Sequence, residues 1–198
     1  ANRLLGMIKR TFPRIEKETF IALYKSLVRS ILDYGGSVWS PGTWSKKNLR
    51  MVENVQRRAT KLVPALRNLS YRERLEHLNL PTLNYRRNRY DLITLFKIIH
   101  GFEDIDYRKF FEFKIGKTRG HRFKIDKKGC NKSKKLNSFP ARCINAWNDL
   151  NDSTVCCDTI VSFKSKLDKE WRLERFNVNI IYQPGSLIET RIGGVNKS

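Results

Sequence analysis

Apolar residues recur at the spacing of amphipathic helices through the first hundred positions, and this periodicity restricts the fold more than any other feature. Over 18–34 they fall on one helical face, at Phe20, Tyr24, Leu27, Val28 and Ile31. A second face runs over 45–63, where Ser45 is a good N-cap and Pro64 should close the helix. Two amphipathic helices joined by a short glycine-containing turn predict an antiparallel pair.

Two further helices are predicted after this pair. Ser70 and Glu73 have the spacing of a capping box, so a short helix should follow them. Pro81 should interrupt it, and Thr82 can cap a longer helix that ends near 101. Arg89 falls on the apolar arc of this longer helix, and we interpret it as half of a structural ion pair.

The residue pattern changes between 114 and 135. Ten lysines and arginines face a single acid there, and glycines stand among alternating polar and apolar residues. This favours strands and a basic turn that follows phosphates, with a solvated loop as the alternative. Helical spacing returns over 139–150 and 158–174, and 178–192 could form a weak hairpin or a tail.

The sequence therefore predicts a mainly α fold with a small β element, that is, an α+β protein. We expect a helical bundle over 1–101, a linker over 102–113, a small mixed domain over 114–176, and a tail or weak hairpin over 177–198.

The start of the chain and its hydropathy bear on its setting. It begins at Ala1 without an initiator methionine or a signal-like segment, so we expect an internal piece of a longer protein. No apolar stretch approaches the ~20 residues that a membrane span needs, so we expect no membrane partner.

Charge indicates the class of partner. Lysine and arginine number 40 against 19 aspartates and glutamates, giving a net charge of +21 and a pI of about 10.2. A polyanion relieves such self-repulsion, and nucleic acid is the commonest one. Charge of this kind also occurs in basic proteins whose lysines only maintain solubility.

Sequence signs of catalysis are weak. A polymerase that uses two magnesium ions needs paired aspartates, and no two aspartates are adjacent. The acids of 103–106 follow a predicted helix end, and we interpret them as a solvent face. The histidines have no neighbouring nucleophile motif, and the four cysteines lack a C-x-x-C pair. We therefore expect no catalytic residue, no metal site and no cofactor in this chain.

Short motifs occur along the chain in a specific order. They are ANRLLGMIKR (1–10), LYKSLVR (23–29), VWSP (38–41), VQRRATK (55–61), LSYRERL (69–75), LPTLNYRR (80–87), TRGH (118–121), NAWNDL (145–150) and SFKSKLDKEW (162–171). In this order they resemble the segment after the catalytic palm of LINE-type non-LTR retrotransposon reverse transcriptases of the jockey-like group. The chain departs from the family at Asn151, where a proline is frequent, and at Cys156-Cys157.

The resemblance implies a context and a role. An endonuclease, the polymerase fingers and a magnesium-binding palm would lie upstream, and this chain would hold the helical thumb that grips the template–primer duplex. The parent RNA-directed DNA polymerase would be intracellular, and nuclear at the integration step if the element is active. The partners would be RNA, an RNA–DNA hybrid or DNA, together with the upstream palm.

We therefore expect a non-catalytic thumb and post-thumb region of a transposable element that binds nucleic acid through backbone phosphates. The expected contacts are Arg57, Arg58 and Lys61 on the thumb and Arg119, His121 and Arg122 downstream. The competing interpretation is a transposon-derived basic scaffold or interaction protein without specific nucleic-acid binding. A third, an independent nuclease, would need metal-dependent cleavage for which we find no residues.

Overall fold

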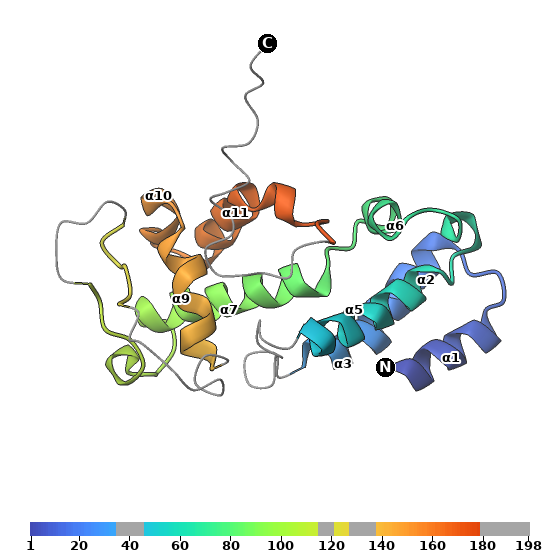
Figure 1. The fold of residues 1–198 in the computed structure, drawn as a ribbon, viewed down its shortest axis with the longest axis horizontal. Helices are drawn as coiled ribbons and strands as arrows, with labels where there is room; N and C mark the ends of the chain where they lie inside the picture. The colour runs from blue at the N-terminus through green and yellow to red at the C-terminus, as the bar shows by residue number, and fades with distance from the viewer. Residues whose placement is uncertain (35–45, 115–120, 127–137, 179–198) are drawn as a thin grey trace, which may run out of the picture. The chain divides into compact units, whose positions relative to one another are not determined.

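Helices form most of the described chain, as the apolar periodicity predicts (Figure 1). The structure, a computed structural model, describes residues 1–34, 46–114, 121–126 and 138–178. These residues divide into two units. The first contains 1–34, 46–87 and 172–178, and the second contains 88–114, 121–126 and 138–171.

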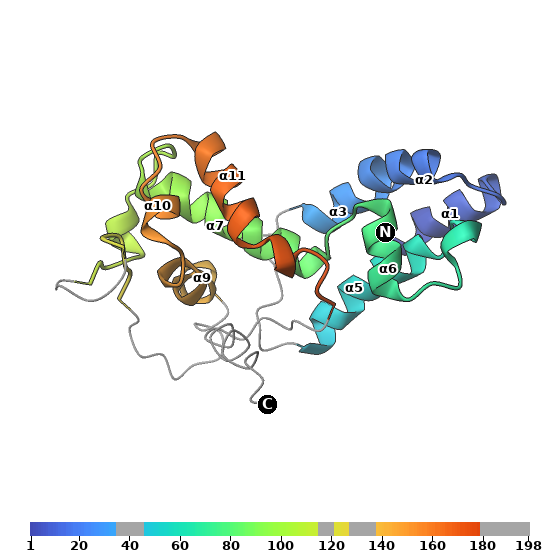
Figure 2. The same cartoon turned by 90° about the horizontal axis from the view of Figure 1, so that it is seen from above.

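The first unit is built around the two helices predicted at 18–34 and 45–63. Its elements are α1 (Asn2–Thr11), α2 (Lys17–Leu23), the π-helix η1 (Tyr24–Arg29), α3 (Ser30–Asp33), α5 (Lys46–Thr60), the 3-10 helix η2 (Pro64–Leu66), α6 (Tyr71–Leu78), the start of α7 (Leu83–Ile99) and the 3-10 helix η4 (Arg172–Glu174). The stretch from α2 through η1 to α3 is continuous, and it runs opposite to α5 in both ribbon views (Figures 1 and 2).

Apolar side chains from these helices form one core. Phe20, Tyr24 and Val28 are buried on the face predicted from their spacing, and Ala59 of α5 is buried in the same cluster. Phe20 and Tyr24 stack with ring centroids 5.6 Å apart. Ile31, predicted on the same stripe, is instead 49% exposed, and Leu32 is buried. The helix pair is thus held by burial of most of the residues in the predicted stripes.

The starts of α6 and α7 follow the predicted signals, whereas α5 ends at Thr60, before the predicted Pro64, which begins η2. Ser70 and Glu73 form the capping box at the start of α6, with each side chain bonded to the other residue's backbone N–H. Asn79 ends α6 in the left-handed region, at φ 50°. Thr82 Oγ1 accepts a hydrogen bond from the backbone N–H of Tyr85 at 3.2 Å, in the first turn of α7.

The second unit packs around the remainder of α7. It adds the 3-10 helix η3 (Tyr107–Lys109), α9 (Phe139–Asn148), α10 (Asp152–Val155) and α11 (Ile160–Glu170). The rings of Phe96 and Phe163 stack at 4.2 Å, and Trp147 lies against Phe163. All three side chains are fully buried.

Two bidentate ion pairs cross the second unit. Arg89 binds Asp168 of α11 at 2.5 and 2.8 Å, which confirms the structural ion pair predicted for this arginine. Arg142 of α9 binds Asp91 of α7 at 2.6 and 2.9 Å, and both side chains are below 10% exposed.

The division of the chain differs from the one expected. The boundary falls between Arg87 and Asn88, inside α7, because successive turns of one helix pack into different cores. The segment 102–113, predicted to be a linker, belongs to the second unit: Phe111 is buried there, and Lys97 pairs with Glu103 at 2.7 Å. A continuous helical stripe hides such a change of partners from the sequence.

The small β element is not shown. Within the described residues, β pairing is limited to one isolated antiparallel bridge between Phe113 and Ile125. Two backbone bonds flank it, from Lys114 N to Lys124 O at 2.8 Å and from Asp126 N to Glu112 O at 2.7 Å. The rest of the predicted strand and turn, and nearly all of the predicted tail hairpin, lie outside the described residues.

Candidate nucleic-acid interface

The solvent face of α5 is cationic along its length. Lys47, Arg50, Asn54, Arg58 and Lys61 follow one another at intervals of three or four residues, which places them along one side of the helix. All five are exposed. Met51 is also exposed on this helix.

The single acid of α5 is turned away from this face. Glu53 Oε1 accepts a hydrogen bond from the Tyr71 hydroxyl at 2.5 Å, and its Oε2 accepts one from the backbone N–H of Leu83 at 3.0 Å. Burial raises the pKa of Glu53 above its ordinary value, and these hydrogen bonds oppose the rise. No carboxylate of α5 therefore competes with an external anion for the exposed cations.

Buried polar contacts hold the rotation of α5 about its axis. Gln56, only 1% exposed, accepts from the Tyr24 hydroxyl at 2.5 Å and donates its Nε2 to Pro81 O at 2.9 Å. Arg74 Nε donates to Thr60 Oγ1 at 3.0 Å. Turning α5 would break these bonds inside the core, where unpaired polar groups are costly. The cationic side is therefore kept toward solvent.

Two of the predicted contact residues are held by neighbours although they are exposed. The Arg57 guanidinium lies 4.6 Å from the centre of the Tyr71 ring, and Arg58 Nη2 donates to Asn2 Oδ1 at 2.9 Å. Such contacts reduce the side-chain entropy lost when a ligand binds. Together with the exposed Lys61, the structure brings the three predicted thumb contacts onto one surface of the first unit.

The downstream candidates do not form a matching group. Arg119 lies outside the described residues. Arg122 is exposed on the second unit, with its guanidinium 4.9 Å from the centre of the Phe123 ring. It remains a predicted contact.

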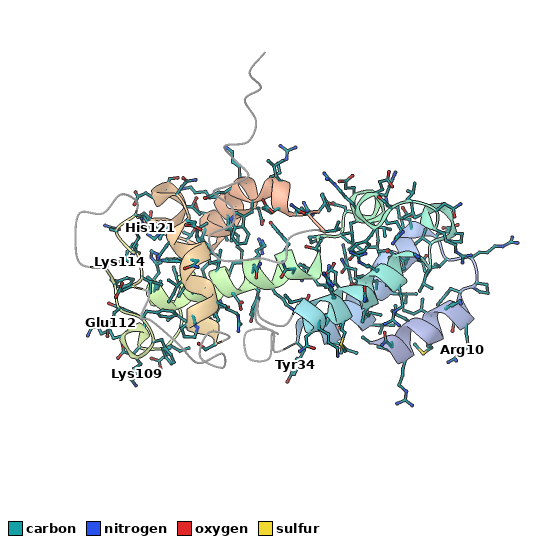
Figure 3. All side chains as sticks on the ribbon, viewed as in Figure 1. Arg10, Tyr34, Lys109, Glu112, Lys114 and His121 are labelled. Atoms are coloured by element: carbon teal, nitrogen blue, oxygen red, sulfur yellow. The ribbon has the colours of Figure 1, made fainter. Side chains whose placement is uncertain are left out.

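His121 has a different position from the one predicted (Figure 3). It is 3% exposed, its Nε2 bonds Trp147 O at 2.9 Å, and its ring meets the Trp147 ring edge-on. Burial lowers the pKa of His121, which favours the neutral imidazole. A buried core residue does not fit the predicted phosphate contact. Its burial depends on packing with residues far along the chain, which a short motif does not reveal.

Charge is unequally divided between the two units. Among the described residues, the first unit has 20 lysines and arginines against 7 aspartates and glutamates, whereas the second has 11 against 11. The basic character of the described chain therefore belongs to the unit that contains α5. Seven further lysines and arginines of the sequence, between 115 and 137, lie outside the described residues.

The prediction from sequence missed Lys47 and Arg50, which extend the face toward the start of α5. The signal was available, because both residues share the helical register of Arg58 and Lys61. The motif VQRRATK at 55–61 covers only the last part of the helix.

Other kinds of site have little support in the described residues. No group of three or more His, Cys, Asp or Glu there could hold a metal ion. Cys143 and Cys157 are buried and Cys156 is partly buried; all three are free thiols, and burial raises the pKa of Cys143. Within the described helices, none has the length and apolar character needed to cross a membrane.

Comparison with known proteins adds no relative: no family model, no curated protein and no solved structure matches this chain.

Proposed function

We propose that this chain is the non-catalytic thumb and post-thumb region of a LINE-type non-LTR reverse transcriptase, and that it binds RNA or an RNA–DNA hybrid through the backbone phosphates. The observation that carries the binding proposal is the cationic face of α5, with its one acid turned inward. The ordered motifs of the sequence support the family, and the excess charge of the first unit supports a polyanionic ligand.

Phosphate neutralisation is the mechanism that suits this face. Arginine presents a planar fork of donors to a phosphate, and lysine presents a compact point charge. Arg57 and Arg58 are positioned before the ligand arrives, by Tyr71 and Asn2. Each contact releases counterions, so affinity should fall steeply as salt rises.

The same face offers little for reading bases. Its exposed residues are lysines, arginines, Asn54 and Met51, and α5 has no aromatic residue on which a base could stack. Binding should therefore be largely independent of sequence, which is appropriate for a surface that follows a moving duplex.

The test is a salt titration of the full chain against a short RNA–DNA hybrid. Replacing Arg57, Arg58 and Lys61 by alanine should flatten the plot of log K against log salt by up to about three contacts, at roughly 0.9 per contact. The matched control replaces Lys164, Lys166 and Lys169 of α11, which removes the same charge from the second unit. Its slope should stay near that of the unchanged protein.

An equal change in both folded variants would show that only overall charge matters. That result would favour the alternative, a transposon-derived basic scaffold, and so would equal affinity for heparin and RNA. An unchanged slope in the α5 variant would remove this helix from the site.

A further inference from the structure

We infer that the phosphate-binding surface continues from α5 onto α1, where Arg3 and Arg10 provide additional contacts with the same nucleic-acid backbone. This inference rests on the proposed function and extends its site to a helix for which no element was predicted from the sequence.

α1 repeats the charge pattern of α5. Leu5 and Ile8 are buried in the core of the first unit, so the opposite side of the helix meets solvent. Arg3, Met7 and Arg10 occupy that side at intervals of four and three residues. No acid occurs anywhere in α1. Its exposed side is therefore cationic without internal competition.

A hydrogen bond joins the two surfaces. Asn2, at the start of α1, accepts the hydrogen bond from Arg58 of α5. Arg3 follows Asn2 directly, so the α1 arginines begin where the α5 surface reaches its last turns. Both ribbon views show α1 beginning beside α5 and continuing outward from there (Figures 1 and 2).

The far end of α1 extends the surface further. The Arg10 side chain projects away from the ribbon at that end (Figure 3). An α-helix rises about 1.5 Å per residue, so α1 spans about 15 Å and α5 about 22 Å. Phosphates of one strand are spaced about 3.4 Å apart along the duplex axis. A duplex of about six base pairs would match α5 alone, and α1 lengthens the contact.

The experiment compares three double variants of the full chain. Arg3→Ala with Arg10→Ala should flatten the salt slope by about two contacts, at roughly 0.9 each. The control is Arg14→Ala with Lys17→Ala, which removes the same charge from exposed positions beside Glu16 and Glu18. These two residues lie outside α1 and α5, so its slope should change little. Arg3→Lys with Arg10→Lys should keep the slope, because the charge is retained.

A series of RNA–DNA hybrids of increasing length supplies a second readout. Affinity of the unchanged chain should go on rising at lengths where binding by the Arg3→Ala/Arg10→Ala variant has levelled off. Circular dichroism checks that each variant is folded.

Failure of this inference is distinguishable from failure of the proposed function. One outcome is that the α5 triple variant flattens the slope while the Arg3→Ala/Arg10→Ala variant has the slope of its control and the length dependence of the unchanged chain. In that case the site ends at α5. If neither variant differs from its control, the proposed function is overturned as well. A lysine variant that behaves like the alanine variant would contradict a charge-based contact at α1.

Discussion

Buried polar side chains place the cations of the first unit. Glu53, Gln56 and Thr60 are polar residues of α5 that point inward, and each has a hydrogen-bond partner on another element. The sequence shows Gln56 on the apolar stripe of α5, and the structure explains its position through Tyr24 and Pro81. These hydrogen bonds determine which side of α5 faces solvent, and so they keep its lysines and arginines exposed for the proposed phosphate contacts.

The Arg142–Asp91 pair gives a stability prediction for the second unit. Both side chains are buried. Burial lowers the pKa of Arg142, but the hydrogen bonds and negative charge of Asp91 outweigh that effect, so the pKa is raised. Asp91→Ala would leave the guanidinium buried without its carboxylate, at a cost of about 3–5 kcal/mol in unfolding free energy. Chemical denaturation measures this change.

The control for that variant is the exposed pair between Arg72 and Glu76 on α6. Glu76→Ala should change the free energy of unfolding by less than about 1 kcal/mol, because water screens this pair. Equal effects of the two substitutions would contradict the importance given to burial at Asp91.

Two histidines predict a dependence of stability on pH. Burial lowers the pKa values of His100 and His121, and the positive charges of Arg122 and Lys124, respectively, act in the same direction. Backbone bonds to Val155 and Trp147 and nearby carboxylates oppose this shift without reversing it. A folded-state pKa below the unfolded value of about 6.5 gives stability that is present above that pH and is lost as pH falls through it.

The free energy of unfolding should therefore decrease between pH 7.5 and pH 5.5. Substituting both histidines by glutamine should reduce this decrease, because the neutral amide does not titrate and its nitrogen can take the place of Nε2. His77, which is exposed on α6, supplies the control substitution His77→Gln. A pH dependence that the double variant leaves unchanged would contradict the assignment.

At the scale of helices, local signals predict most of the structure. The stripes at 18–34 and 45–63, the capping box at Ser70 and the helices around 83–99, 139–148 and 160–170 all depend on interactions within a few residues. α1 was not predicted, because only Leu5 and Ile8 of its residues are buried. The sequence also did not indicate the π-helix η1. Its backbone hydrogen bonds join residues five apart, whereas those of α2 and α3 on either side join residues four apart.

At the candidate site too, the sequence predicts what depends on residues close together in the chain and misses what depends on distant ones. Arg57, Arg58 and Lys61 share a surface because one helix carries them, and helical register is readable in sequence. The inward position of Glu53 depends on Tyr71 and Leu83, and the burial of His121 depends on Trp147. Contacts between residues far apart in the chain leave no comparable pattern in a single sequence.

The capping box at the start of α6 provides a test at this scale. Ser70→Ala removes the acceptor for Glu73 N–H and should lower the free energy of unfolding by about 1 kcal/mol. Ser70→Asp retains an acceptor at the N-cap and should preserve most of that stability. Thermal denaturation of the two variants decides the point: equal losses would mean that the cap contributes nothing.

At the scale of the whole molecule, the excess of basic residues among the described part of the chain lies in the first unit. The first has a large excess of basic residues among those described, and the second is balanced. Electrostatic attraction to a polyanion should therefore act on the first unit through its described surface, and the basic segment 114–135, in the sequence of the second unit, should add to it.

Lysine acetylation footprinting of the full chain, with and without a saturating RNA–DNA hybrid at low salt, tests the central claim most directly. Lys47 and Lys61 at the two ends of the α5 face should be protected several-fold, and the protection should disappear at high salt. Lys109 and Lys169, exposed on the second unit, should react at the same rate in both samples. Equal protection of all four lysines, or protection of the second-unit pair alone, would contradict a phosphate-binding site on α5.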